Sequence, residues 1–227
     1  MSLPHYHLTI DTEAVKTLAD VVFTLNQLTS VLSGTDLSSL VVFNRMYIII
    51  TNHYIQAVAE GWFEQPETVA RLGVTFANYY FHALNTHAQT GVLPEVWDKF
   101  IDYRRQPKRP VFIALLLAAN AHINHDLALS IRDTGLAADA KSDFRRSARI
   151  FRQASSEIIT AFREPELSMN YFKRKLKFLY QWPMIAIILH YRRRAWKQGQ
   201  RLLRGSITTS TITRQANRIA TTLLRLS

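Results

Sequence analysis

The chain has 227 residues, nearly half of them hydrophobic, with seven Gly, seven Pro and no Cys. This length and apolar content suffice for one large domain with a sizeable core, whereas so few Gly and Pro argue against a turn-rich β-sandwich. Because Cys is absent, disulfides and thiolate metal sites are excluded, and any metal would be held by His, carboxylate or amide groups.

The charge is divided unevenly along the chain. Of the 28 Lys and Arg, 4 lie in residues 1–100 beside 9 Asp and Glu, so residues 101–227 carry 24 basic and 8 acidic residues. Such an excess predicts an anionic partner, which could be nucleic acid, a membrane surface or a phosphorylated ligand. A solvated basic helical surface is an equally good interpretation.

The apolar runs are too short to cross a membrane. Pro110–Ala121 and Leu179–Leu189 are each about twelve residues long, against the about 20 that a spanning helix needs. Residues Met1–His7 have neither the basic start nor the apolar region of a secretory signal. We therefore expect a cytoplasmic protein without a transmembrane segment.

Helical spacing of apolar residues, bounded by Gly and Pro, accounts for the first 135 residues. Thr35 or Asp36 can cap the second helix, and Gly91 and Gly135 can end the third and the fifth. The helices predicted here are Glu13–Ser33, Thr35–Glu60, Pro66–Thr90, Pro94–Tyr103 and Val111–Asp133.

The second half continues in the same way and is rich in basic residues. Pro165 and Pro183 separate its helices. The predicted ranges are Ala140–Arg163, Met169–Tyr180, Met184–Leu203 and Thr208–Leu226. Since no convincing strand pattern or internal repeat is present, we predict a single all-α domain, a multi-helix bundle of about seven to nine helices. A subdivision into site-bearing helices (1–135) and a basic helical layer (140–227) is an alternative.

One polar block stands out in this pattern. Residues Asn120–Asp126 read Asn-Ala-His-Ile-Asn-His-Asp and follow the apolar run of a buried helix. Burying such groups is costly unless each has a partner, so their clustering indicates a functional site. A buried polar network that only pins one helix against the next is the alternative interpretation.

The spacing of this block is compatible with a metal site or an acid–base site. At about 100° per residue, His122, His125 and Asp126 share one arc, while Asn120 and Asn124 lie together on another face. Imidazole and carboxylate groups suit zinc, iron or manganese. Because one helix rarely completes a metal site, a fourth ligand would come from elsewhere. The candidates for it are His53, Glu60, His82 and His87.

Neighbouring helices offer further candidate site residues. Tyr47 and Thr51 share a face of the second helix, and Tyr80 lies on the third. Arg45 is one of only four basic residues in the first hundred, and we expect it to pair with a specific carboxylate, that of Asp126 or Asp102.

The region Phe43–Leu129 resembles a bacterial family known as domain of unknown function fifty-nine ninety-five. The resemblance rests mainly on Asn120–Leu129, and also on Phe43-Asn44-x-x-Tyr47, Phe76-Ala77-x-x-Tyr80 and Trp97 with Phe100. No activity is established for that family. The resemblance therefore implies a polar helical site without naming its reaction.

Two functions follow as hypotheses. In the first, the protein is an enzyme acting on a small-molecule ligand, either a metal-dependent hydrolase or oxygenase or one in which His122 or His125 is the general base. Asp126 would then fix the tautomer, and Asn120 or Asn124 would orient the ligand. In the second, the protein is a non-enzymatic binding protein whose basic C-terminal half docks on nucleic acid or a membrane surface.

Overall fold

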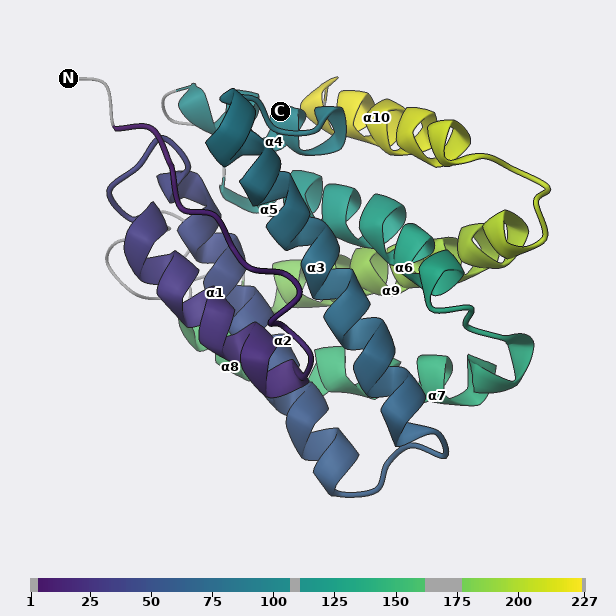
Figure 1. Cartoon of the computed structure of the whole chain (residues 1–227). Coiled ribbons are helices and arrows are strands. Elements are labelled where there is room, and N and C mark those ends of the chain that lie inside the picture. Colours follow the sequence, from purple (N-terminus) through teal and green to yellow (C-terminus); the bar gives the residue numbers. More distant parts are fainter. Residues whose placement is uncertain (1–3, 107–110, 162–176, 226–227) are drawn as a thin grey trace.

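The computed structural model describes residues 4–106, 111–161 and 177–225, and in these ranges it contains helices and no β-strand. The prediction of an all-α fold is confirmed. In Figure 1 the segment labelled α5 and α6 (residues 111–133) lies between other helices, and α8 (Ala148–Ala161) of the second half lies beside α2 (Val41–Ala59) of the first half.

The first half contributes four helices, which agree with the predicted ranges except at two starts. They are α1 (Leu18–Leu32), α2 (Val41–Ala59), α3 (Pro66–Thr90) and α4 (Glu95–Arg105). Helix α1 begins later than predicted because Thr17 and Asp20 form a capping box, in which each side chain accepts a hydrogen bond from the other residue's N–H. Helix α2 follows a 3₁₀ turn (Ser38–Leu40), since the Asp36 carboxylate accepts from Tyr6 N–H instead of capping a helix.

The central helix has three consecutive parts. They are α5 (Val111–Ala119), a π-helical stretch η2 (Asn120–Asp126) and α6 (Leu127–Asp133). Helices α3, α4, α9 and α10 pack against this central helix, so its side chains are buried on nearly every side. The polar block predicted as a site therefore lies in the middle of the molecule (Figure 1).

In the second half, α9 and α10 pack against this central helix, whereas α8 packs against α2 and α9. The elements of the second half are η3 (Ala138–Ala140), α7 (Lys141–Arg146), α8 (Ala148–Ala161), α9 (Lys177–Leu203) and α10 (Thr209–Arg225). The helix predicted over Ala140–Arg163 is interrupted at Ser147, whose hydroxyl bonds back to the carbonyl of Phe144 at 2.9 Å. Arg163 and most of the helix predicted over Met169–Tyr180 lie outside the described residues.

Helix α9 begins at Lys177, seven residues before the predicted start at Met184, and so includes Pro183. Proline removes one backbone hydrogen bond, a loss that the other turns of a 27-residue helix can compensate. Farther along, Gly199 allows close approach to α6. A Cβ at this position would lie 2.5 Å from Ile131 Cγ2 and 3.1 Å from the carbonyl oxygen of Ala128.

Two main hydrophobic clusters lie on either side of η2. The first joins Tyr6, helices α1 to α5 and Ala216 of α10, while the second joins η2, α6, α9 and the start of α10. The first cluster thus contains residues from both ends of the chain, and the single-domain organisation stays a prediction.

None of the described helices is both long enough and apolar enough to span a bilayer.

Candidate functional site

The predicted polar block adopts a rare conformation. Asn120–Asp126 form a π-helix, in which hydrogen bonds run from i to i+5 instead of i to i+4. Such stretches inside an otherwise regular helix are frequent at functional sites. Six of the seven residues are buried, and His125 is the exception.

Asp126 is the centre of the site. Its Oδ2 lies 3.2 Å from His122 Nδ1 and 3.3 Å from Trp97 Nε1, and its Oδ1 lies 2.7 Å from His125 Nδ1. Burial favours the neutral acid, but hydrogen bonds from the two histidines outweigh it and lower the pKa of Asp126. An ionised carboxylate only accepts hydrogen bonds, so both histidines carry their proton on Nδ1.

His122 is enclosed by aromatic rings. Its imidazole stacks on Phe76 with centroids 3.7 Å apart and meets Tyr47 at 4.8 Å and Phe43 at 5.4 Å. This burial lowers the pKa of His122, although the hydrogen bond to Asp126 opposes the shift. The ring is therefore neutral, and its Nε2 is a buried acceptor without a hydrogen-bond partner among the described residues.

His125 connects the buried carboxylate to the surface. Nδ1 of His125 faces Asp126, and Nε2 of the same ring lies 3.2 Å from the hydroxyl oxygen of Thr213 on α10. That hydroxyl is also 3.2 Å from the carbonyl oxygen of Thr209. With Nδ1 protonated, Nε2 carries a lone pair that competes with the Thr209 carbonyl for the single Thr213 hydroxyl proton. When Nε2 accepts this proton, the three groups form a line of carboxylate, imidazole and hydroxyl.

Asn120 and Asn124 are bonded to each other and to α10, and their predicted role in orienting a ligand stays a prediction. Asn120 Nδ2 donates to the carbonyl of Ala216 on α10 at 2.8 Å, and Asn124 Nδ2 donates to Asn120 Oδ1 at 2.9 Å. These bonds fasten α10 to η2 and thereby place Thr213 beside His125. The arrangement favours a positioning role for both residues.

The remaining predicted residues differ in how they reach the site. Tyr47 forms part of the aromatic enclosure, and burial raises its pKa well above the ordinary value. Thr51 donates to the carbonyl of Tyr47 at 2.8 Å, while Tyr80 donates to Asn44 Oδ1 at 2.7 Å and lies 6.0 Å, ring to ring, from His122. Arg45 is half-buried on α2, and the groups bonded to Asp126 are the two histidines and Trp97.

A small, mainly apolar cavity lies next to the enclosure. It has a volume of about 60 Å³, room for a few water molecules or a small ligand group. Tyr47, Thr51 and Phe76 line it on the side of His122, and Phe144, Phe151 and Arg192 also line it. The rings of Tyr47 and Phe76 therefore contact both the cavity and the His122 imidazole.

The suggested fourth metal ligands have other partners or lie in solvent. His53 pairs with Glu157 at 3.0 Å, Glu60 accepts a hydrogen bond from Gln56, and His82 is exposed. His87 lies 3.4 Å from Asp36. A metal on His122, His125 and Asp126 stays a prediction.

Sequence reasoning missed two members of this site. Thr213 is 88 residues away from His125 in the chain and lies in a Thr-rich helix start without any motif. The Trp97 indole, which donates to Asp126, is part of the family resemblance but was not assigned to the site.

Comparison with known proteins gives a family and no function. The model of a family of unknown function (DUF5995) matches residues 18–226. The match extends from α1 to α10 and is thus wider than the region Phe43–Leu129 on which the resemblance was based. No curated protein and no solved structure matches the chain.

Proposed function

The chain belongs to this family of unknown function, and we propose from its geometry that it is a hydrolase in which His125 is the general base. The observation that carries the proposal is the alignment of Asp126, His125 and Thr213, with distances of 2.7 Å and 3.2 Å between successive groups. A base oriented by a carboxylate and directed at a hydroxyl is the arrangement used in nucleophilic catalysis.

Each group has a defined task in the proposed reaction. The Thr213 hydroxyl oxygen attacks the carbonyl carbon of an ester, and its proton moves to His125 Nε2. The bond from that carbon to the alcohol oxygen breaks, and the alcohol leaves with the proton from His125. Water then attacks the acyl carbon and gives a proton to His125. The bond from that carbon to the Thr213 oxygen breaks, Thr213 takes the proton back from His125, and the acid leaves. Asp126 stabilises the imidazolium in both steps.

The location of these groups supports the proposal. The side chain of Asp126 is 3 % exposed and that of His125 13 %, so the carboxylate is shielded while the imidazole can be reached from solvent. Thr213 is partly exposed on α10. A substrate carbonyl could therefore approach Thr213 from outside without opening the core.

Incubation with an activated ester such as p-nitrophenyl acetate tests the proposal. We expect release of nitrophenol and, by mass spectrometry, an acetyl group on Thr213. Both should disappear in Thr213→Ala and in His125→Ala, with a rate loss of about 10²–10⁴-fold for the base, and Thr213→Ser should keep the activity.

Thr222→Ala is the matched control, because Thr222 lies on the same helix and bonds only to the carbonyl of Arg218. Unchanged turnover in Thr213→Ala and His125→Ala would refute the proposal. Activity that survives in Thr213→Ala but not in His125→Ala would assign the attack to water and remove Thr213 from the chemistry.

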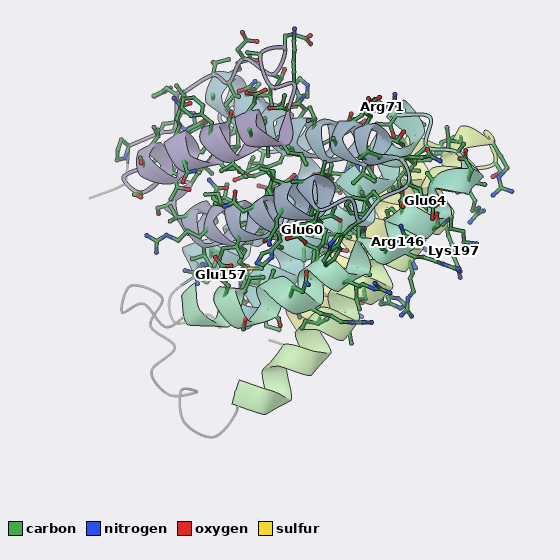
Figure 2. All side chains as sticks on the ribbon, turned by 90° about the horizontal axis from the view of Figure 1, so that it is seen from below. Glu60, Glu64, Arg71, Arg146, Glu157 and Lys197 are labelled. Atoms are coloured by element: carbon green, nitrogen blue, oxygen red, sulfur yellow. The ribbon has the colours of Figure 1, made fainter. Side chains whose placement is uncertain are left out.

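A basic groove favours a second candidate function, the binding of a nucleic-acid backbone. The groove has a volume of about 760 Å³ and lies along α7, α8 and α9, and none of its lining residues in the described ranges is acidic. Figure 2 shows Lys197, one of these residues, at the outer edge of the molecule. The basic lining residues are Lys141, Arg145, Arg152, Arg192, Arg193, Lys197, Arg201 and Arg204.

The salt dependence of binding to a single-stranded oligonucleotide tests this function. Each phosphate contact should contribute about −0.7 to the slope of log affinity against log salt. The pair Lys197→Glu and Arg201→Glu should weaken binding, whereas Arg214→Glu with Arg218→Glu, exposed on α10 outside the groove, should change it little. Equal effects of the two pairs, or binding only to anionic vesicles, would contradict it.

A further inference from the structure

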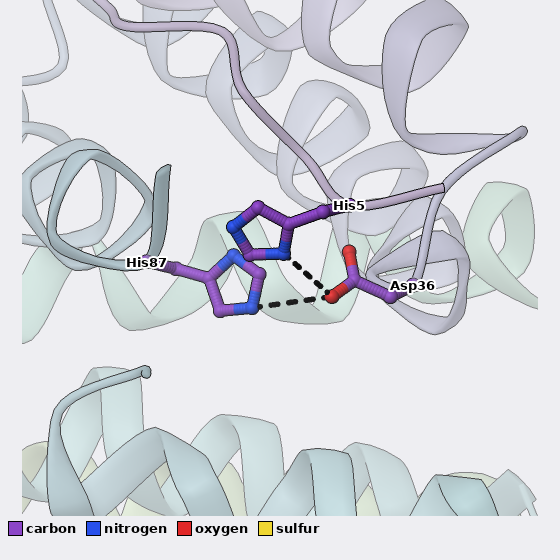
Figure 3. Close-up of side chains that lie close together, drawn as sticks. All are labelled: His5, Asp36 and His87. Carbon is purple, nitrogen blue, oxygen red and sulfur yellow. Dashed lines mark hydrogen bonds and ion pairs between the residues drawn. The ribbon is translucent and has the colours of Figure 1, made fainter. Parts of the chain in front are cut away.

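A second cluster of metal-ligating side chains lies far from η2 in the sequence. His5 of the N-terminal segment, Asp36 of the loop after α1 and His87 near the end of α3 each offer one ligand atom, and these atoms lie within 4.8 Å of one another. Figure 3 shows the two imidazoles directed at the same carboxylate. None of the three belongs to the proposed hydrolytic site.

The distances in this cluster match those between ligands of a tetrahedral ion. His5 Nδ1 lies 3.1 Å and His87 Nε2 3.4 Å from the same oxygen, Asp36 Oδ2. Bonds of about 2.0–2.1 Å at tetrahedral angles place neighbouring ligand atoms about 3.3 Å apart. The two nitrogen–oxygen separations lie close to this value, and the third separation, between the two nitrogens, is within 4.8 Å.

The carboxylate is also held as a metal ligand usually is. Asp36 Oδ1 accepts a hydrogen bond from Tyr6 N–H at 3.0 Å, which leaves Oδ2 for the two histidines. Asp36 N–H in turn donates to the carbonyl of Pro4 at 3.0 Å. Such outer contacts fix the orientation of a ligating group, and their loss lowers metal affinity by about 10–100-fold.

We propose that His5, Asp36 and His87 bind a divalent ion of the zinc class. Two imidazole nitrogens and one carboxylate oxygen form a ligand set that zinc uses, with a water molecule in the fourth position. His7 is the alternative fourth ligand, because it is exposed and its ring centroid lies 4.7 Å from that of His5.

The ion would fasten the N-terminal segment to the helices. Tyr6 is fully buried in the first hydrophobic cluster, and Ile10 exchanges two hydrogen bonds with the side chain of Asn85 on α3 at 2.7 Å and 2.8 Å. A metal bond from His5 to α3 and to the loop after α1 would add a third attachment of this segment. The expected role is therefore structural, and it is independent of both proposed functions.

Zinc titration of the untagged, metal-free full chain tests the proposal. Calorimetry should give one tight equivalent of Zn²⁺, and the Tm should rise with zinc. His5→Ala and Asp36→Asn should each weaken zinc binding by more than about 100-fold. This exceeds the loss of affinity expected when a residue that only hydrogen-bonds to a metal ligand is replaced. His5 lies outside the helices, so its variant should still fold, which circular dichroism would check.

Two controls identify the site. His82→Ala, on the exposed face of α3, and Thr213→Ala should keep the full zinc affinity. His7→Ala tells the two fourth ligands apart, since affinity falls if His7 binds the ion and stays the same if water does. The proposal is overturned if zinc does not bind, or if it binds equally well to the folded His5→Ala and Asp36→Asn variants.

Discussion

Replacement of Asp126 by Asn separates the structural and the catalytic roles of the buried carboxylate. The carboxylate accepts from three donors, His122 Nδ1, His125 Nδ1 and Trp97 Nε1. An amide has the same shape but one accepting oxygen. If this oxygen accepts the hydrogen bonds from His122 and Trp97, the amide NH₂ group faces His125 Nδ1 and cannot accept a hydrogen bond from it.

The expected loss of stability follows from this geometry. A hydrogen bond to a charged group contributes about 1.5–3 kcal/mol, and the substitution removes one such bond and the charge from the other two. We expect the free energy of unfolding to fall by about 2–4 kcal/mol. Chemical denaturation at pH 7 measures this change, and Asp133→Asn on the partly exposed end of α6 is the matched control.

The expected loss of activity has a separate cause. With an amide NH₂ beside it, His125 Nδ1 must accept, so the proton moves to Nε2 and the base can no longer take a proton from Thr213. A comparable change of tautomer in a serine protease lowers kcat by about 10⁴-fold. We expect ester hydrolysis to fall by about 10³–10⁴-fold in protein that is still folded. An Asp126→Asn variant with unchanged stability and turnover would refute both arguments.

Four further predictions concern pH, α10 and helix packing. Burial lowers the pKa of His122, so the unfolded chain takes up a proton near pH 6.5 that the folded chain does not, and the free energy of unfolding should fall as the pH drops below about 6.5. Chemical denaturation from pH 8 to 5 should show a shallower decline of this free energy in His122→Gln. An equal decline in both proteins would contradict the assignment of the pH dependence to His122. Because the pKa of Asp126 is lowered, its contribution is present above about pH 4 and is lost as the pH falls through the folded value, so acid denaturation should be less steep in Asp126→Asn. Asn120→Ala should lower the free energy of unfolding by about 1–3 kcal/mol and increase amide hydrogen exchange in α10, because the carbonyl of Ala216 loses its hydrogen-bond donor. Exchange that rises equally in α1 would indicate a loss of stability of the whole protein instead. Gly199→Ala should lower the free energy of unfolding by about 1–3 kcal/mol, because the added Cβ would meet Ile131 and the backbone of Ala128. In Gly73→Ala the added Cβ meets only the flexible end of Leu18, so the loss in the same denaturation assay should be smaller.

The fold class could be read from the sequence because it depends on local patterns. Apolar residues at helical spacing and punctuation by Gly and Pro act within one helix, so α3 was predicted over its exact range of Pro66–Thr90. Helix starts were less predictable where a side chain has a distant partner. Asp36 could have capped a helix, but Tyr6 and His5 take its carboxylate.

The polar block was visible in the sequence for a related reason. Five polar groups in a buried apolar run are costly unless they have partners, and this holds whatever the partners are. That His122, His125 and Asp126 lie together followed from their spacing on one helix, and the hydrogen bonds from both histidines to Asp126 agree with it.

Only the tertiary structure decided which distant groups complete the two sites. Thr213 reaches His125 because α10 packs on η2, and His5 reaches His87 because the N-terminal segment crosses the end of α3. Periodicity determines which face a residue occupies on its own helix, but not which helix lies opposite. That choice depends on the packing of the whole core, and therefore the partners of Asp126 and Asp36 appear only when the chain is folded.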